Sequence, residues 1–124
     1  MKIEGETLRE LFQAGLLGMS RILCEQGCGK EKEWDKRAAI SLTAPDLTCL
    51  LVDFLSEVLS LTYTEKALFC KMEDIKISET AFSATLLGTR LAKLDEEIKA
   101  VTYHEAQVDK NAVNVWETRI VFDI

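Results

Sequence analysis

The end of the chain carries the residues best suited to metal chemistry. Asp123 is followed by Ile124, so a side-chain carboxylate and the terminal carboxylate stand within two residues of each other. Calcium and magnesium prefer oxygen ligands of this kind, and calcium takes about six to eight of them. The apolar residues Ile120 and Phe122 predict a strand that anchors this corner. Asp123 and Ile124 are therefore the candidate metal ligands, although any chain can end beside an aspartate.

His104 is the single histidine, so a Ser–His–Asp or Cys–His arrangement would have to use it. The strand pairing expected below places Glu117 opposite His104, where a carboxylate would orient the imidazole. A surface histidine paired with an acid gives the same pattern, and we favour that interpretation. Asp53 and Glu57 share a helix face and are most simply its solvated side. The sequence has none of the phosphate-binding, dinucleotide-binding, zinc-protease or serine-hydrolase motifs.

The four cysteines are Cys24, Cys28, Cys49 and Cys70. Met1–Glu6 lacks the apolar core of a signal peptide, so we expect free thiols rather than a disulfide framework. Cys24 and Cys28 would lie on one face of a continuing helix and could begin a metal or redox site. Zinc usually takes four ligands, however, and small buried side chains are the favoured interpretation.

Two amphipathic helices are expected to position these residues. The first begins at Thr7, which forms a capping box with Glu10, and is stopped by Gly27 and Gly29 near Cys28. The second follows Thr43–Asp46, with Pro45 in its first turn. Apolar residues recur in both at spacings of three and four: Leu8, Leu11, Phe12, Leu16, Met19, Ile22 and Leu23, then Leu47, Leu50, Leu51, Phe54, Leu55, Val58 and Leu59.

The remaining segments favour strands. Trp34–Leu42 alternates in part, and Ala67–Ile77 and Ala81–Gly88 predict a hairpin with an irregularity near Glu73 and Asp74. Leu91–Glu97 is charged and predicts a loop. The expected order is helix, strand, helix and four strands, which gives a single α+β domain over residues 1–124. In it the two amphipathic helices pack on a largely antiparallel sheet.

Ile98–Val108 and Val113–Asp123 form the strongest expected strand pair. A four-residue connection places Val108 opposite Val113. The same register places His104 opposite Glu117, Thr102 opposite Arg119, Ala100 opposite Val121 and Ile98 opposite Asp123. The other, more apolar side would carry Val101, Tyr103, Trp116, Ile120 and Phe122.

Composition excludes several classes of protein. The chain has 124 residues, 48% of them hydrophobic and 29% charged, as in a globular domain. No uncharged stretch exceeds Leu11–Ser20 or Thr80–Thr89 in length, so we expect no membrane-spanning helix. The net charge of −6, without a basic run, argues against strong direct binding of nucleic acid.

Three segments carry a family resemblance. Glu97–His104 together with Ile120–Ile124 resembles the C-terminal signature of archease. Gly5–Phe12 resembles the entry to that family's first helix, and Ala44–Leu55 resembles its second. The resemblance covers nearly the whole chain in the right order.

The resemblance implies a cytoplasmic, non-catalytic protein that activates the RNA ligase of tRNA splicing. Such a protein promotes guanylylation of the ligase and its multiple turnover in tRNA splicing and RNA repair. It would bind a divalent cation, often calcium, through Asp123 and the backbone oxygen of Ile124. Lys99 and His104 are candidate contacts with the ligase, although Lys99 is more simply a solvated strand residue.

The chain departs from the family pattern in two places. The family's first strand usually carries a His-Thr-Ala-Asp-like segment, whereas this chain starts Met1-Lys2-Ile3-Glu4, without an aspartate before the first helix. We therefore expect one strand fewer and an incomplete cation site. The segment Thr89–Glu97 also differs from the family's longer one, which contains a histidine.

Two other functions remain open: a protein-interaction module unrelated to RNA ligation, and a small enzyme built on His104 or the cysteines.

Overall fold

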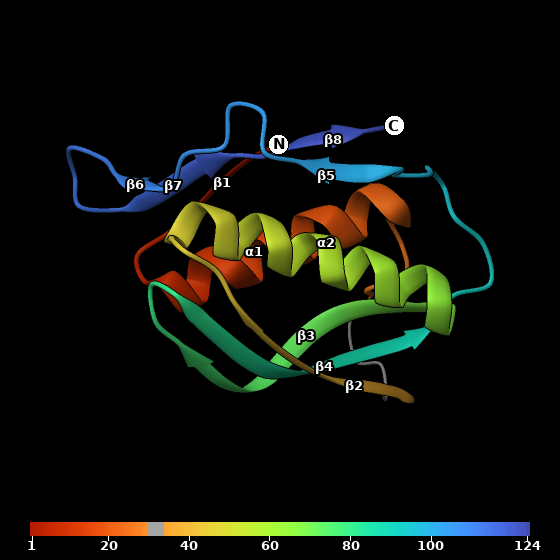
Figure 1. The fold of residues 1–124 in the computed structure, drawn as a ribbon. Helices are drawn as coiled ribbons and strands as arrows, with labels where there is room; N and C mark the ends of the chain where they lie inside the picture. Colours follow the sequence, from red (N-terminus) through yellow and green to blue (C-terminus); the bar gives the residue numbers. More distant parts are fainter. Residues whose placement is uncertain (30–33) are drawn as a thin grey trace.

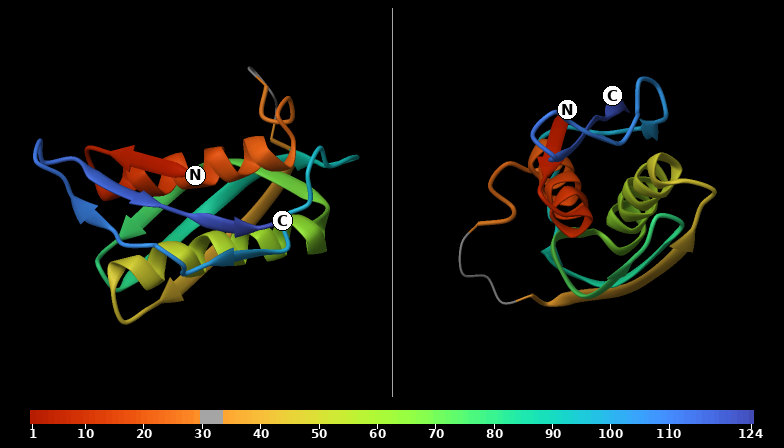
Figure 2. Two further views of the ribbon diagram at one scale, coloured as in Figure 1. Left: turned by 90° about the horizontal axis from the view of Figure 1, so that it is seen from above. Right: turned by 90° about the vertical axis from the view of Figure 1, so that its left-hand side faces the viewer.

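A computed structural model describes residues 1–29 and 34–124, and its two helices lie between two layers of strands (Figure 1). The helices are α1 (Leu8–Leu23) and α2 (Leu47–Glu65). The strands are β1 (Lys2–Gly5), β2 (Lys36–Thr43), β3 (Ala67–Ile77), β4 (Ala81–Arg90), β5 (Ala100–Thr102), β6 (Asp109–Lys110), β7 (Trp116–Arg119) and β8 (Val121–Asp123). The strand pairs described are all antiparallel. The predicted α+β class is confirmed, but the helices are covered on both faces (Figure 2).

The lower layer is a sheet with the strand order β2-β4-β3. The predicted hairpin is present, because β3 and β4 are joined by residues 78–80. Their register shifts between Phe69 and Lys71 and again between Glu73 and Lys76. Asp74 has a φ of 54°, so the irregularity expected near Glu73 and Asp74 is confirmed.

The upper layer is formed by β1-β7-β6 and by β5-β8. The single long C-terminal hairpin is therefore a wrong prediction. Ala100 lies opposite Asp123 and Thr102 opposite Val121, two residues away from the expected register, and Asp109 lies opposite Glu117. The pairs expected for His104 and for Val108 do not form.

A turn between β5 and β6 causes this difference. Ala106 donates its N–H to the carbonyl of Tyr103, and Glu105 has a φ of 59°. The backbone N–H of Val108 then donates to the Thr48 hydroxyl at 3.0 Å rather than to the carbonyl of a neighbouring strand. The expected apolar side is confirmed only in part. Val101 and Ile120 are buried, Trp116 and Phe122 are half-buried, and Tyr103 is 55% exposed.

β1 was not expected, because only one of its four residues, Ile3, is apolar and no alternation is visible over so short a run. It pairs with β7, so that Ile3 lies opposite Thr118. The prediction that no strand precedes the first helix is therefore wrong. Pairing with β7 brings the two ends of the chain into the same layer (Figure 2).

The helix starts agree with the sequence more closely than the ends. The Thr7 hydroxyl accepts the N–H of Glu10 at 3.1 Å, and the Glu10 carboxylate accepts the N–H of Glu6. α1 ends at Leu23 rather than near Cys28, because Cys24 is extended and the Leu23 carbonyl accepts the N–H of Asp95 at 2.7 Å.

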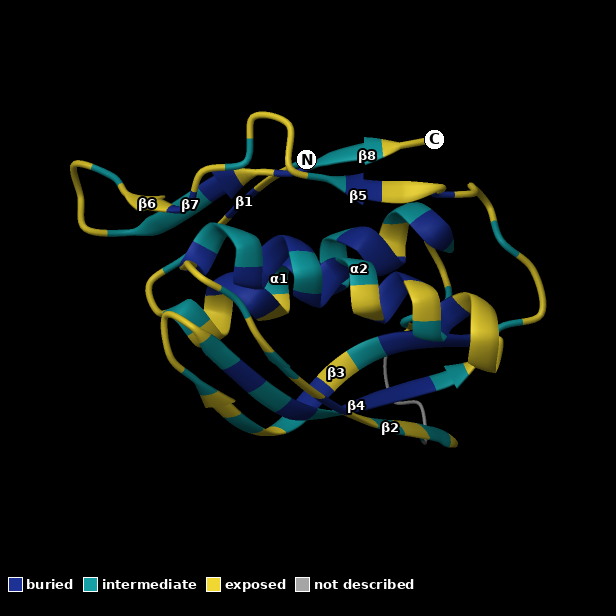
Figure 3. Ribbon diagram, in the orientation of Figure 1, coloured by how far each residue is buried: buried dark blue, intermediate teal, exposed yellow. Residues whose placement is uncertain are grey.

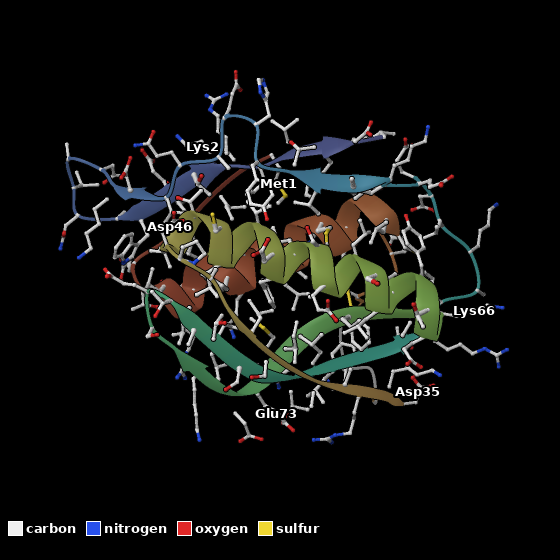
Figure 4. All side chains as sticks on the ribbon, viewed as in Figure 1. Met1, Lys2, Asp35, Asp46, Lys66 and Glu73 are labelled. Atoms are coloured by element: carbon white, nitrogen blue, oxygen red, sulfur yellow. A yellow bond between two sulfur atoms is a disulfide. The ribbon has the colours of Figure 1, made fainter. Side chains whose placement is uncertain are left out.

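In α2 the N-cap is Asp46, labelled in Figure 4, whose side chain accepts the N–H of Cys49 at 2.8 Å. Pro45 precedes this cap, so its expected place in the first turn is wrong. α2 ends at Glu65 and is capped by Lys66, which adopts a left-handed conformation with a φ of 51°.

The core lies on both faces of the helix layer (Figure 3). At its centre Phe12 of α1, Phe54 of α2 and Phe82 of β4 pack together, with ring centroids 4.7 to 5.4 Å apart. α2 is long and apolar enough to cross a membrane by length and composition alone. Nine of its 19 residues are buried in the protein, which is the pattern of a core helix between two sheets.

Cys28 and Cys70 form a disulfide that ties the segment after α1 to β3. The expectation of four free thiols is therefore wrong for this pair, whereas Cys24 and Cys49 are free. The pairing is invisible in the sequence, because 42 residues separate the two cysteines. Cys24 and Cys28 do not share a helix face, since α1 ends before both of them.

Candidate functional site

The candidate site is the C-terminal corner of the upper layer, formed by the pairing of β5 with β8. The backbone N–H of Lys99 donates to the carbonyl of Asp123 at 2.6 Å. The Thr102 hydroxyl donates to the carbonyl of Val121 at 3.0 Å. These bonds and the ladder between the strands fix the backbone up to the penultimate residue.

A second set of bonds holds the start of β8. Ile120 is fully buried, and its N–H donates to the carbonyl of Met1 at 2.7 Å. The amino group of Met1 donates back to the carbonyl of Ile120 at 2.8 Å. The first residue of the chain thus closes the junction between β7 and β8.

The side chains that the sequence singled out at this corner are solvent-accessible. Asp123 and Lys99 are exposed, and Ile124 is 59% exposed. The backbone bond between residues 99 and 123 places an ammonium-bearing and a carboxylate-bearing residue beside each other. The corner therefore presents one cationic and one anionic side chain on a fixed backbone.

His104 lies apart from this arrangement, in the turn after β5. Its Nε2 is 3.8 Å from a carboxylate oxygen of Glu105, and both side chains are exposed. Glu117 instead accepts a bond from the Asn111 amide and lies 3.7 Å from the ammonium of Lys2. The predicted pair of His104 and Glu117 is absent, so the geometry gives the imidazole no orienting carboxylate across a strand.

Two tyrosines that the sequence did not indicate as functional attach this corner to α2. The Tyr63 hydroxyl donates to the carbonyl of Ile98 at 2.6 Å and accepts its N–H at 3.0 Å. Tyr103 donates to the carboxylate of Asp53. That bond, together with burial and the negative charge of Asp53, raises the pKa of Tyr103 to about 12. Both contacts join segments at least 35 residues apart, which no local pattern can predict.

The start of α2 adds further acidic character near Tyr103. The bond from the Cys49 N–H lowers the pKa of Asp46. The hydrogen bond from its thiol to Asp46, burial and the charges of Asp46 and Asp53 raise the pKa of Cys49. Cys49 is therefore kept as a neutral thiol, which is the weaker nucleophile and metal ligand.

The corner fits a hard cation in the type of its donors but not in their number. Asp123 supplies carboxylate oxygens and Ile124 backbone oxygen, and both kinds of donor suit calcium or magnesium. Among residues 1–29 and 34–124, no group of three or more His, Cys, Asp or Glu side chains is placed to hold a metal ion. The remaining ligands of a cation here would have to be water or oxygens of a bound partner.

Comparison with known proteins gives the family. The model of the Archease protein family (MTH1598/TM1083) matches residues 1–124. Protein archease of Methanosarcina acetivorans is 32% identical over 128 residues, which cover 97% of this chain and 85% of that protein. Protein archease of Pyrococcus furiosus is 30% identical, over 97% of this chain and 87% of that protein.

Solved structures agree on the fold. A crystal structure of an archease from Thermotoga maritima, described as a possible chaperone, has a TM-score of 0.66, 21% identity and coverage of 100% of this chain and 88% of its own. The solution structure of protein 1598 of Methanobacterium thermoautotrophicum has a TM-score of 0.73 and 21% identity, covering 99% and 89%. With a family match over its whole length and relatives above 30% identity, the chain belongs to the archease family.

Proposed function

We propose that this protein is a non-catalytic activator of the RNA ligase of tRNA splicing. In this proposal it promotes guanylylation of the ligase and its multiple turnover, in the cytoplasm. Membership of the archease family supports the proposal. So does the net charge of −6, which disfavours a grip on RNA and favours a basic protein surface.

The observation that carries the proposal is the C-terminal corner. Asp123, Ile124 and Lys99 are exposed, yet the backbone of Asp123 and Lys99 is held by the β5–β8 ladder and by the bond between these two residues. Fixed charges at an exposed strand end reach a partner's cleft at little entropic cost. We assign Asp123 and Lys99 as the main contacts with the ligase. His104, in the neighbouring turn, is an additional contact.

We further propose that Asp123 and Ile124 hold a divalent cation, with calcium as the expected ion. Because the residues of this corner supply only the Asp123 carboxylate and the backbone oxygen of Ile124, binding should be weak in the free protein and stronger when the ligase adds oxygens. Calorimetric titration of calcium into the free protein, the ligase and their mixture tests this. The proposal requires tighter binding by the mixture than by either component, and loss of that gain with Asp123→Asn.

Ligase turnover with the wild type, Asp123→Ala and Lys99→Ala tests the activator role. Glu79→Ala is the matched control, because Glu79 is an exposed acid in the β3–β4 turn of the other layer. We expect the wild type and Glu79→Ala to raise turnover and the guanylylated fraction of ligase equally, and Asp123→Ala to lose roughly tenfold or more of the effect. Equal stimulation by Asp123→Ala would remove this carboxylate from the mechanism. If the wild-type protein does not stimulate the ligase, the proposed activator function is wrong.

A further inference from the structure

The outer edge of β2 is an open sheet edge. Along Lys36–Thr43 the strand pairs with β4, from Lys36 opposite Gly88 to Thr43 opposite Ala81. Within the described residues no other strand lies beside it. Alternate residues of an antiparallel strand direct their N–H and C=O groups away from the partner, so β2 presents a row of unpaired donors and acceptors.

Residues 38–43 of β2 lack the devices that usually protect such an edge. Its charged residues, Lys36 and Arg37, stand at its start, and residues 38–43 carry neither charge nor proline. Its register with β4 has no shift over eight residues. At the opposite edge of the same sheet, β3 has two register shifts and carries Lys71 and Lys76, and Lys66 directly precedes it. One edge of the sheet is therefore protected against pairing and the other is open.

Two acidic side chains, Asp53 and Glu57, lie beside this open edge. Residues 39–43 of β2, together with Asp53 and Glu57 of α2, line a cavity of about 320 Å³. β2 lies at the margin of the lower sheet below α2 (Figure 2). In the described part of the chain neither acid forms an ion pair; Glu57 is exposed, and Asp53 accepts the Tyr103 hydroxyl.

The spacing of the two acids suits a strand. Asp53 and Glu57 are four residues apart on α2, a rise of about 6 Å. Alternate residues of a strand are about 6.8 Å apart and lie on one face. Two basic side chains at alternate positions of an added strand therefore match the two carboxylates, while its backbone pairs with β2.

We propose that the β2 edge binds an extended basic segment of a partner protein, which adds as a fourth strand to the lower sheet. The exposed backbone supplies affinity and the two acids select lysine or arginine. Self-pairing of two β2 edges would bring Asp53 and Glu57 of two chains, each of net charge −6, close together. Because these charges repel, a second copy of the chain is the less favourable partner. The edge lies in the sheet opposite the C-terminal corner, and the proposal does not depend on the ligase.

The test uses a synthetic eight-residue peptide with lysine at alternate positions and valine or threonine between them. Its binding to the full chain is followed by NMR. Two control peptides have glutamate in place of lysine, or N-methyl groups on the amides of one edge. Glu57→Lys is the test variant, and Glu65→Lys, at the far end of the same helix, is the control with the same change of charge.

We expect the lysine peptide to shift the amide signals of residues 38–43 and to bind about fivefold or more weakly to Glu57→Lys, which replaces an attraction by a repulsion. Glu65→Lys should bind within twofold of the wild type, and both control peptides should fail to bind. Equal loss with Glu65→Lys, binding of the glutamate or N-methylated peptide, or no binding at about 1 mM peptide would overturn the proposal. A dimer that buries residues 38–43 without peptide would replace it by self-association.

Discussion

The hydroxyl of Tyr103 is bonded to the carboxylate of Asp53, which joins the turn after β5 to the middle of α2. Asp53 also lines the groove beside β2. The Asp53 carboxylate therefore has two neighbours: it binds Tyr103 beside the C-terminal corner, and it lies next to the open edge of β2. Its bond to Tyr103 has consequences that can be measured at high pH.

Tyr103→Phe removes this bond without changing the ring. We expect the free energy of unfolding to fall by about 0.5 to 1 kcal/mol, at the low end for a hydrogen bond because the side chain is 55% exposed. The measurement is urea denaturation at pH 7. A more stable Tyr103→Phe variant would contradict the role given to the bond.

The pH dependence has a definite sign. The pKa of Tyr103 is raised from 10.0 to about 12, so the neutral phenol is favoured in the folded protein. The contribution of this group is fully present below pH 10 and is lost as the pH rises from 10 to 12. The difference in stability between wild type and Tyr103→Phe should therefore vanish over that range. In an absorbance titration of tyrosinate, the step near pH 12 should be missing from the variant.

The disulfide gives a prediction about redox conditions. Under denaturing, non-reducing conditions, thiol titration should find two free thiols, from Cys24 and Cys49, and four after reduction. A bond that closes a loop of 42 residues stabilises by about 2 to 4 kcal/mol, so Cys28→Ser should lower the free energy of unfolding by that amount in oxidising buffer. In reducing buffer the variant and the wild type should be nearly equal. Cys24→Ser is the control and should change stability little in either buffer.

Phe82 packs against both Phe12 and Phe54, with ring centroids 5.1 and 4.7 Å away. Truncation to alanine leaves a cavity between both helices and β4, so we expect Phe82→Ala to lower the free energy of unfolding by about 3 to 5 kcal/mol. Chemical denaturation measures it. Val113→Ala, at a residue that is 76% exposed, is the surface control and should remain within about 0.5 kcal/mol of wild type.

Asp46 caps α2, and its pKa is lowered chiefly by the bond from the Cys49 N–H. A carboxylate with a lowered pKa contributes stability above its ordinary value of 3.8, and this contribution is lost as the pH falls through the lowered value. Asp46→Ala should therefore lower the midpoint of thermal unfolding at pH 7. The difference from wild type should shrink below about pH 4. Asp46→Asn should retain most of the midpoint at both pH values, because asparagine is also a good cap.

The elements with strong local signals were predictable from the sequence. The apolar periodicity of both helices, the Thr7 cap and the β3–β4 hairpin with its irregularity at Asp74 all agree with the structure. These features are set within one helix or one hairpin. The place of Asp123 beside Lys99, by contrast, depends on the observed register of β5 with β8, which differs from the predicted one by two residues.

Three of the failures have a common physical cause, which is distance along the chain. β1 forms because β7 is available, Cys28 meets Cys70, and α1 stops where Asp95 caps Leu23. The C-terminal register was wrong because the turn at Glu105 removes residues 103–108 from the ladder. Its positive φ is unusual for glutamate, so no residue preference indicates the turn.

Pairing of the first strand with a strand near the end of the chain has a consequence for synthesis. β1 cannot pair until β7 has left the ribosome, and β7 is synthesised more than 100 residues after β1. Until then, the apolar residues of α1 that pack under β1 remain exposed to solvent. We therefore expect the incomplete chain to be prone to aggregation, and completion of the upper layer to be the folding step that removes this exposed apolar surface.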